Sequence, residues 1–177
     1  PKGKIAEHPD TRLPGIETVS GSLGHGLGIG AGIAFSNFLK NKKKIFTYVL
    51  LGDGECNEGS VWETAMFASH HKLSNLIVIV DRNMMSVLDK TENIISLEPF
   101  KDKWKSFGWN VKVVDGHNIK KLYDTLSDFK SSKINKPHVL IAKTKKGKGI
   151  SFMENKIKWH HGLPNNDEYL KSIKELN

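Results

Sequence analysis

The amino-acid sequence predicts an α/β fold, a doubly wound and mostly parallel sheet with helices on both faces. Four apolar runs rich in β-branched residues have the length of strands and are nearly continuous in hydrophobicity, which is typical of strands buried on both faces. These runs are residues 45–51, 76–81, 111–114 and 138–144. Segments with helical spacing separate them, and this alternation favours right-handed crossovers between parallel strands.

The segments between the expected strands carry apolar residues at the spacing of one helix face. The three sets are Val61, Ala65 and Ala68, then Trp104 and Phe107, then Leu122, Leu126 and Phe129. The first of these helices is expected to open with a capping box, because Ser60 is followed three residues later by Glu63. After the last strand we expect a polar loop over 145–159 and a short helix over 167–176.

A glycine-rich helix is expected before the first strand, over residues 22–39. Its apolar residues follow helical spacing, but it also contains glycines at 24, 26, 28, 30 and 32. Each glycine costs up to about 1 kcal/mol relative to alanine in a helix interior. We therefore expect these glycines to allow the close approach of another backbone or of a ligand.

Length and composition indicate one soluble globular domain. The chain has 177 residues, of which 38% are hydrophobic, enough for a buried core. The longest apolar runs are too short to cross a bilayer and no signal-peptide pattern is present, so no membrane partner is expected. Cys56 is the only cysteine, which is compatible with a cytoplasmic location, and we interpret it as a packing residue.

The net charge of +8 could attract anionic substrates or nucleic acid. The lysines are scattered instead of being interleaved with aromatic residues, so no nucleic-acid partner is expected. Two clusters, at 42–44 and 145–148, are the densest. Solvation of a loop or of a strand end explains them, and attraction of phosphate is the alternative that the sequence leaves open.

Polar residues follow two of the expected strands at their carboxyl ends. Gly52-Asp53-Gly54 comes directly after the first strand, and Asn83 follows the second. A Gly-Asp-Gly alone is more often a turn than a site, but parallel strand ends meet at one edge of a sheet, where open α/β folds bind ligands. Carboxylate and amide oxygens are hard ligands that suit Mg²⁺ or Ca²⁺. These residues therefore predict a site for a divalent cation, and not for zinc.

Taken with its surroundings, this pattern resembles the thiamine diphosphate motif of the transketolase family. The resembling blocks, in chain order, are residues 13–17, 21–26, Gly52-Asp53-Gly54 with Glu58-Gly59, and Asp115-Gly116-His117. The likeness runs from about residue 7 to residue 170. It implies the thiamine diphosphate-binding fold, with residues 1–177 forming the diphosphate-binding domain. The natural amino-terminal part of that domain and the pyrimidine-binding domain are expected to be absent from this chain.

The resemblance assigns cofactor-binding residues by matching positions. Its metal ligands are Asp53, Asn83 and the main-chain carbonyl of Met85, holding Mg²⁺ with Ca²⁺ or Mn²⁺ as alternatives. Around the cofactor it places Gly54 and Glu55 at the diphosphate, Gly21 and Leu23 near the aminopyrimidine, and Val87 near the thiazolium. One departure is local: the family often continues from the asparagine into Ile-Asp-Gly, whereas this chain reads Ser86-Val87-Leu88-Asp89-Lys90. That difference leaves donor specificity open.

Histidines and acidic residues complete the implied site. His8, in a His-Pro dipeptide, resembles a histidine that binds the sugar substrate, and His161 resembles one that reaches substrate and cofactor phosphate. Without the resemblance, His8 would be interpreted as an exposed loop histidine. Glu58 and Glu63 match residues near the subunit interface, although acidic residues at a helix start are also common because the helix dipole favours them.

The implied activity is the transfer of a two-carbon ketol unit between sugar phosphates, as in the pentose phosphate pathway. The glutamate that activates the cofactor and the aromatic pyrimidine pocket are expected on a C-terminal transketolase subunit, so this chain is expected to be inactive alone and to work in a homo- or hetero-oligomer. A 2-oxoacid dehydrogenase-like subunit and a non-catalytic binding or regulatory subunit are the alternatives. A dinucleotide-binding loop at 24–32 is disfavoured, because no expected strand precedes it.

Overall fold

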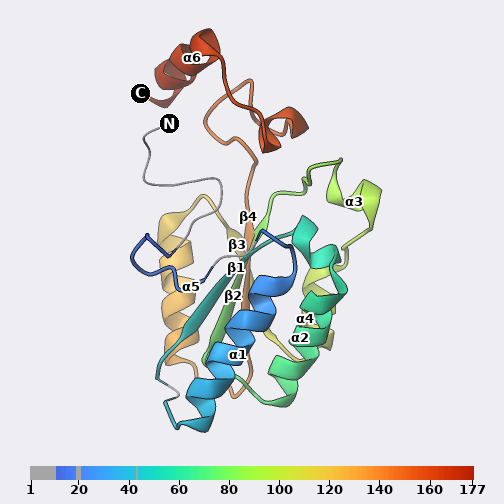
Figure 1. Cartoon of the computed structure of the whole chain (residues 1–177), viewed down its shortest axis with the longest axis vertical. Coiled ribbons are helices and arrows are strands. Elements are labelled where there is room, and N and C mark those ends of the chain that lie inside the picture. The colour runs from blue at the N-terminus through green and yellow to red at the C-terminus, as the bar shows by residue number, and fades with distance from the viewer. Residues whose placement is uncertain (1–10, 19–20, 43) are drawn as a thin grey trace.

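The structure is a computed structural model that describes residues 11–18, 21–42 and 44–177. Its centre is a sheet of four parallel strands in the order β1-β2-β4-β3 (Figure 1). The strands are β1 Thr47–Gly52, β2 Leu76–Arg82, β3 Asn110–Asp115 and β4 His138–Lys143. Each expected strand is present with ends shifted by no more than two residues, and the predicted α/β fold with a parallel sheet is confirmed.

Helices cover both faces of the sheet, as a doubly wound fold requires. The helices in chain order are α1 His25–Leu39, α2 Gly59–His70, α3 Thr91–Ile94, α4 Phe100–Ser106, α5 Ile119–Ser131 and α6 Asn166–Leu176, with short 3-10 turns η1 Gly54–Asn57 and η2 Ile157–His160. Helices α1, α2 and α4 lie on one face and α5 lies on the other (Figure 1). The strands run upward in this view, so their carboxyl ends meet at the upper edge of the sheet.

The core has two unequal parts, one on each face of the sheet. The larger joins α1, α2 and α4 to the strands and includes Trp104 and Cys56, while the smaller lies under α5 around Phe129 and Leu140. Cys56 is fully buried, and this desolvation raises the pKa of its thiol. The interpretation of Cys56 as a packing residue is therefore confirmed.

The expectation that all four strands are buried on both faces is wrong for the two edge strands, β1 and β3, and β3 has no buried residue. Val49 and Leu51 point toward α1 and are buried, whereas Tyr48 and Leu50 point to the opposite face and are 47% and 72% exposed. The reason is position in the sheet: β1 and β3 are its two edge strands, and α5, on the face opposite α1, packs against β3 and β4 and leaves Tyr48 and Leu50 uncovered. Full burial holds for the interior strands β2 and β4.

Two local predictions at helix starts are also wrong. Helix α1 begins at His25 instead of residue 22, because Gly24 has a left-handed backbone with φ 82°. Helix α2 begins at Gly59, so Ser60 lies inside it and forms no capping box with Glu63. The Ser60 hydroxyl instead donates to the Gly24 carbonyl at 3.1 Å, which joins the starts of the two helices.

The carboxyl-terminal part leaves the sheet after β4 and lies above the carboxyl ends of the strands (Figure 1). Helix α6 has the capping box that α2 lacks, since Asn165 Oδ1 accepts from the Glu168 N–H and Glu168 Oε2 accepts from the Asn165 N–H. Glu175 near its end accepts from the Ser151 hydroxyl, which holds α6 against the preceding loop. Among the residues that the structure describes, no helix has both the length and the apolar character needed to cross a membrane.

Candidate functional site

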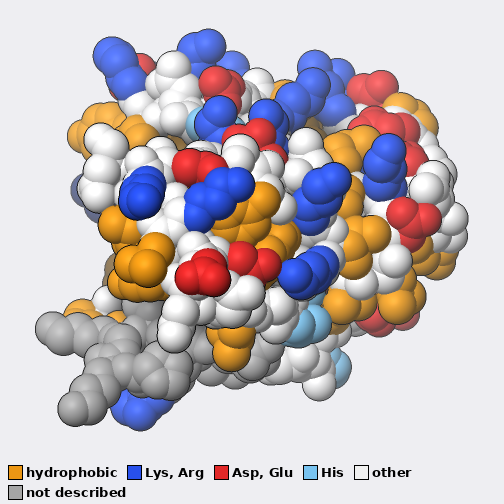
Figure 2. All heavy atoms as spheres, turned by 90° about the horizontal axis from the view of Figure 1, so that it is seen from above, with side chains coloured by type: hydrophobic (Ala, Val, Ile, Leu, Met, Phe, Trp, Pro, Cys, Tyr) orange, Lys and Arg blue, Asp and Glu red, His pale blue; other side chains and the backbone are white. Residues whose placement is uncertain are grey.

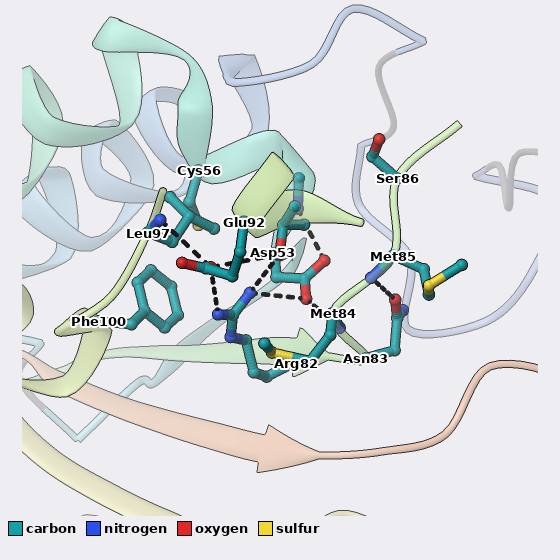
Figure 3. Close-up of polar contacts among 12 residues, drawn as sticks. Asp53, Cys56, Arg82, Asn83, Met84, Met85, Ser86, Glu92, Leu97 and Phe100 are labelled. Carbon is teal, nitrogen blue, oxygen red and sulfur yellow. Dashed lines mark hydrogen bonds and ion pairs between the residues drawn. The ribbon is translucent and has the colours of Figure 1, made fainter. Parts of the chain in front are cut away.

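The carboxyl ends of β1 and β2 are neighbours, and the predicted metal ligands follow them directly. Gly52 pairs with Asp81, and the Asp53 N–H donates to the Asp81 carbonyl at 3.2 Å. The chain then turns into η1 after Asp53, while the residues after β2 turn back toward it. Parallel register therefore brings together Asp53, Asn83, Met84 and Met85, which we call the strand-end site (Figure 3).

Asp53 is almost fully buried, at 1% exposure, and its carboxylate accepts several hydrogen bonds. Oδ1 accepts from the Gly54 N–H at 2.8 Å. Oδ2 accepts from the Met84 N–H at 2.7 Å and from Arg82 at 3.2 Å. Burial raises the pKa of Asp53 above its ordinary value, while the Met84 N–H, the Arg82 charge and the Gly54 N–H oppose that rise.

Asn83 is fixed by its own neighbours on β2 and in the turn. Its Oδ1 accepts from the Met85 N–H at 2.9 Å, and its Nδ2 donates to Asp81 Oδ2 at 2.9 Å. Met84, between Asn83 and Met85, has a positive φ of 66°, which bends the chain back over Asp53. The amide is thereby held with its oxygen toward the turn.

The Met85 carbonyl faces the same side as Asn83. Met85 pairs with Lys90 in an isolated antiparallel bridge, flanked by the bonds Thr91 N–H to Met84 O and Ser86 N–H to Asp89 O. In such a pairing, the N–H and C=O of the middle residue point away from the partner segment. Since the Met85 N–H reaches Asn83, its carbonyl is directed toward that side as well.

These contacts allow a test of whether the residues fit a divalent cation. An oxygen of a carboxylate or amide can accept two hydrogen bonds. Asp53 Oδ1 and Asn83 Oδ1 each accept one backbone N–H from the part of the chain that the structure describes, which leaves one acceptor position on each oxygen there. Among the described residues no three His, Cys, Asp or Glu side chains form a metal cluster. The strand-end site thus offers hard oxygen donors only, a set that fits Mg²⁺, Ca²⁺ or Mn²⁺.

Gly54 and Glu55, which the resemblance places at the diphosphate, are held by contacts within the chain, and their contact with the diphosphate stays a prediction. Glu55 Oε1 accepts from the Gly24 N–H at 2.9 Å and Oε2 accepts from the Gly52 N–H at 3.2 Å, so its carboxylate clamps two backbone segments. A Cβ on Gly54 would lie 3.2 Å from Ser86 Cβ, which is a tight contact. Gly54 therefore permits the residues after Met85 to approach η1.

The other predicted cofactor contacts lie on exposed segments near this edge. Leu23 is 59% exposed and Val87 45% exposed, and Gly21 is exposed before α1. Ligand contact at these three positions stays a prediction.

Of the two predicted catalytic histidines, His161 lies among the described residues. His161 is exposed just after η2, with its ring 4.7 Å from that of His160, in the segment above the strand ends. His8 lies outside the described residues. Their catalytic roles stay predictions.

Glu58 and Glu63, the predicted interface residues, are both exposed on or beside α2. Glu58 is the residue preceding the first turn of α2, and its side chain makes no capping hydrogen bond. An ideal Cβ on Gly24 would lie 2.7 Å from Glu58 Cβ, which places Glu58 against the start of α1. Their interface role stays a prediction.

A cavity of about 480 Å³ opens at the same edge of the sheet on the α5 side. Its polar lining includes Asp81, Asn83, His117, Thr144 and Lys146. Thr144 donates to Asp81 Oδ1, and His117 Nε2 accepts from the Lys145 N–H at 2.8 Å, so β2, β3 and β4 are tied together here. Seen from above, the face over this edge mixes basic with acidic side chains instead of forming a field of one sign (Figure 2).

Sequence reasoning missed several of these residues. His117 belongs to the Asp115-Gly116-His117 motif, and Lys146 belongs to the lysine cluster at 145–148. Each follows an expected strand, and that position could have identified both residues. Arg82 had a weaker signal, as one charged residue at a strand end, yet it is 4% exposed and contacts Asp53. Only the structure shows that it is buried.

Comparison with known proteins agrees with this geometry. Residues 2–176 match the family described as transketolase, thiamine diphosphate binding domain. The chain is 42% identical over 172 residues to one of the subunits of the apulose-4-phosphate transketolase of Phocaeicola vulgatus, covering 97% of this chain and 60% of that protein. It is 36% identical over 177 residues to the 6-deoxy-6-sulfo-D-fructose transketolase subunit SqwG of a Clostridium species, covering 99% and 64%.

Solved structures show the same relationship. The transketolase of Campylobacter jejuni superposes with a TM-score of 0.84 at 29% identity, over 96% of this chain and 27% of that chain. The chain spans about three fifths of the length of the first curated relatives it matches. Because the family match extends over nearly every residue and these relatives agree with it, the chain belongs to the transketolase family as a thiamine diphosphate-binding domain.

Proposed function

We propose that this chain is the amino-terminal, cofactor-binding part of a split transketolase. It binds thiamine diphosphate through a divalent cation and, with a C-terminal subunit carrying the pyrimidine-binding domain, transfers a two-carbon ketol unit between sugar phosphates. The observation that carries the proposal is the strand-end site, where Asp53 Oδ1 and Asn83 Oδ1 each keep an acceptor position beside the Met85 carbonyl. When bound, thiamine diphosphate would supply the nucleophilic carbon that ketol transfer requires.

This chain's own residues anchor and orient the cofactor in the proposal. Asp53, Asn83 and Met85 supply oxygen ligands to the cation, which in turn neutralises the diphosphate. Gly54 contributes backbone at the diphosphate, and Glu55 acts indirectly, because its carboxylate is occupied by the Gly24 and Gly52 N–H groups. The cavity lined by His117 and Lys146 offers further donors close to Asn83. His161 and His8 contact the hydroxyl groups of the sugar, because an imidazole ring can both donate and accept a proton.

The need for a partner chain is supported by the relatives. Two of them are named as a single subunit of an apulose-4-phosphate transketolase, and each is matched along nearly the whole of this chain. We infer that the activating glutamate and the pyrimidine pocket come from a separate subunit, with Glu58 and Glu63 at or near the interface. The oligomer acts on sugar phosphates, and it resides in the cytoplasm.

The first test measures cation-dependent cofactor binding. Thiamine diphosphate is titrated calorimetrically into the full chain with millimolar Mg²⁺ and with EDTA, for wild type and Asp53→Asn. The variant keeps the side-chain shape and loses the charge of one ligand, so we expect binding to weaken by at least about 100-fold. Asp102→Asn, on an exposed carboxylate of α4, is the matched control and should bind as wild type. Equal binding by Asp53→Asn and wild type would contradict the proposed site.

The second test adds the co-purified partner chain and compares pentose phosphates with pyruvate as donor. Ketol transfer only in the presence of both chains supports the proposal. Decarboxylation of pyruvate would favour the 2-oxoacid dehydrogenase alternative. A wild-type chain that fails to bind cofactor at millimolar Mg²⁺ beside its partner would favour a non-catalytic role.

A further inference from the structure

Arg82 is a buried cation that the proposed ligand set does not use. It is the last residue of β2, directly before Asn83, and is 4% exposed. Its guanidinium Nη1 donates to Asp53 Oδ2 at 3.2 Å and to Thr91 Oγ1 at 2.8 Å. Its Nη2 donates to Glu92 at 2.7 Å (Figure 3) and also to Glu98 at 2.9 Å.

The contacts of Arg82 decide which Asp53 oxygen remains available. Oδ2 receives two donors, the Met84 N–H and Arg82, and both of its acceptor positions are used. From the described residues, Oδ1 receives only the Gly54 N–H and keeps one acceptor position. With Oδ2 occupied, a cation can be bound through Oδ1 alone, on the side of Gly54 and the turn.

A guanidinium so close to a metal-binding carboxylate would repel a divalent cation unless its charge were offset. Glu92 and Glu98 supply that offset, because both contact Nη2 on the side away from Asp53. Hydrogen bonds from Ser96 and Arg82 outweigh the effect of burial and lower the pKa of Glu92 to about 2, so it is ionised at neutral pH. Around Arg82 one positive charge thus faces three carboxylates.

The shape of the arginine side chain also matters. Its planar fork reaches Asp53 with one nitrogen and the two glutamates with the other, which a single ammonium cannot do in the same geometry. The Phe100 ring lies 5.3 Å from the guanidinium carbon and covers one side of it. Thr91, which accepts from Arg82, also donates its N–H to the Met84 carbonyl, so the turn and α3 form one connected unit.

We propose that Arg82 is a positioning residue for the metal-binding carboxylate, an inference that rests on the proposed function. It fixes Asp53 so that Oδ1 faces the cation, and Glu92 and Glu98 hold Arg82 and offset its charge. Arg82 touches neither cation nor cofactor. Replacing Arg82 is therefore expected to change the affinity for the cation, and this effect can be measured separately from any change in the stability of the fold.

The test measures binding of Mn²⁺ by electron paramagnetic resonance of the free ion, with saturating thiamine diphosphate and the full chain. Arg82→Lys keeps the charge and removes the fork, and we expect it to weaken Mn²⁺ binding by about tenfold, in the range seen for outer-shell partners of metal ligands. Arg82→Met should weaken it further. Lys105→Met, a lysine exposed on α4, is the control and should leave the affinity unchanged.

A second variant removes the offsetting charges without touching Arg82 or Asp53. Glu92→Gln combined with Glu98→Gln alters side chains that are 27% and 55% exposed, so folding is expected to be preserved even if Arg82→Met does not fold. We expect its Mn²⁺ affinity to fall by about threefold or more, because Arg82 then repels the cation. Circular dichroism at the assay temperature establishes that each variant is folded.

The outcomes separate a positioning role from a merely structural one. If folded Arg82→Lys and the double glutamine variant bind Mn²⁺ within about twofold of wild type while melting at lower temperature, Arg82 only stabilises the fold and the proposal is wrong. If wild type itself shows no saturable Mn²⁺ binding with thiamine diphosphate, the proposed function fails, and the positioning role with it.

Discussion

Met84 is a residue whose side chain does not suit its backbone conformation. Its φ of 66° is in the left-handed region, where a Cβ is disfavoured by about 1–2 kcal/mol. The turn needs this conformation, because it directs the Met84 N–H to Asp53 Oδ2 at 2.7 Å while Met85 binds Asn83. The Met84 side chain is 40% exposed, so little packing depends on it.

Replacing Met84 with glycine is therefore expected to stabilise the protein. Relief of backbone strain outweighs the added entropy of the unfolded chain, and we expect the free energy of unfolding to rise by about 1 kcal/mol. Urea unfolding at pH 7 measures the change. Met85→Gly is the control, since Met85 is extended and 8% exposed, and it should destabilise the protein. A less stable Met84→Gly would show that the turn carries no such strain.

At the scale of elements, the contact between α1 and β1 explains one glycine of the glycine-rich helix and leaves others unexplained. A Cβ on Gly30 would lie 2.3 Å from Val49 Cγ2, so only glycine allows this approach of helix to strand. A Cβ on Gly32 would meet no described atom within 4 Å. Close approach of another element is thus confirmed for Gly30, while at Gly32 no described residue comes close and approach of a ligand stays a prediction.

The two glycines predict opposite effects of the same substitution. Gly30→Ala is expected to lower the free energy of unfolding by about 1–3 kcal/mol, because the methyl group must displace Val49 or the helix. Gly32→Ala, on the same helix, is expected to raise it by up to about 1 kcal/mol through helix propensity. Chemical denaturation of both variants checks the pair. Equal changes for the two would mean that helix propensity, and not the contact with β1, sets the response.

At the scale of the whole molecule, stability depends on a histidine buried in the sheet. His138 begins β4, is fully buried and stacks on Phe129 of α5 with ring centroids 4.7 Å apart. Its Nδ1 lies 3.0 Å from Asn110 Nδ2, which donates, so this ring nitrogen accepts the hydrogen bond and carries no proton. Burial lowers its pKa to about 4.

This histidine predicts a loss of stability at mildly acidic pH. The unfolded chain takes up a proton at His138 below its ordinary pKa of about 6.5, and the folded protein does so only near 4, so stability falls as pH falls between these values. We expect His138 to contribute a loss of about 2 kcal/mol between pH 7 and pH 5. Urea unfolding at both pH values should show a smaller loss for His138→Gln than for wild type. His70→Gln, at an exposed position on α2, should behave as wild type.

Residues of the strand-end site differ in how far the sequence reveals them. Asp53 and Asn83 could be found from sequence, because each follows a run of strand-forming residues, and parallel strands bring their carboxyl ends to one edge. Arg82 could not be found, because its burial depends on contacts with Glu92 and Glu98. These residues follow it by 10 and 16 positions and come back to it only in the folded chain. The capping box at Ser60 failed because a tertiary partner, the Gly24 carbonyl, took its hydroxyl.

The sequence by itself determined the α/β alternation, the position of each strand and the family, because these depend on local hydrophobic patterns and on short motifs. Tertiary structure alone decided the strand order, which leaves β1 at an edge with Tyr48 and Leu50 exposed. It also decided how Asp53 is held, since its donors come from η1 and from the end of β2. The physical reason is that hydrophobic period is a property of neighbouring residues, whereas burial and hydrogen-bond partners depend on segments that only folding brings together.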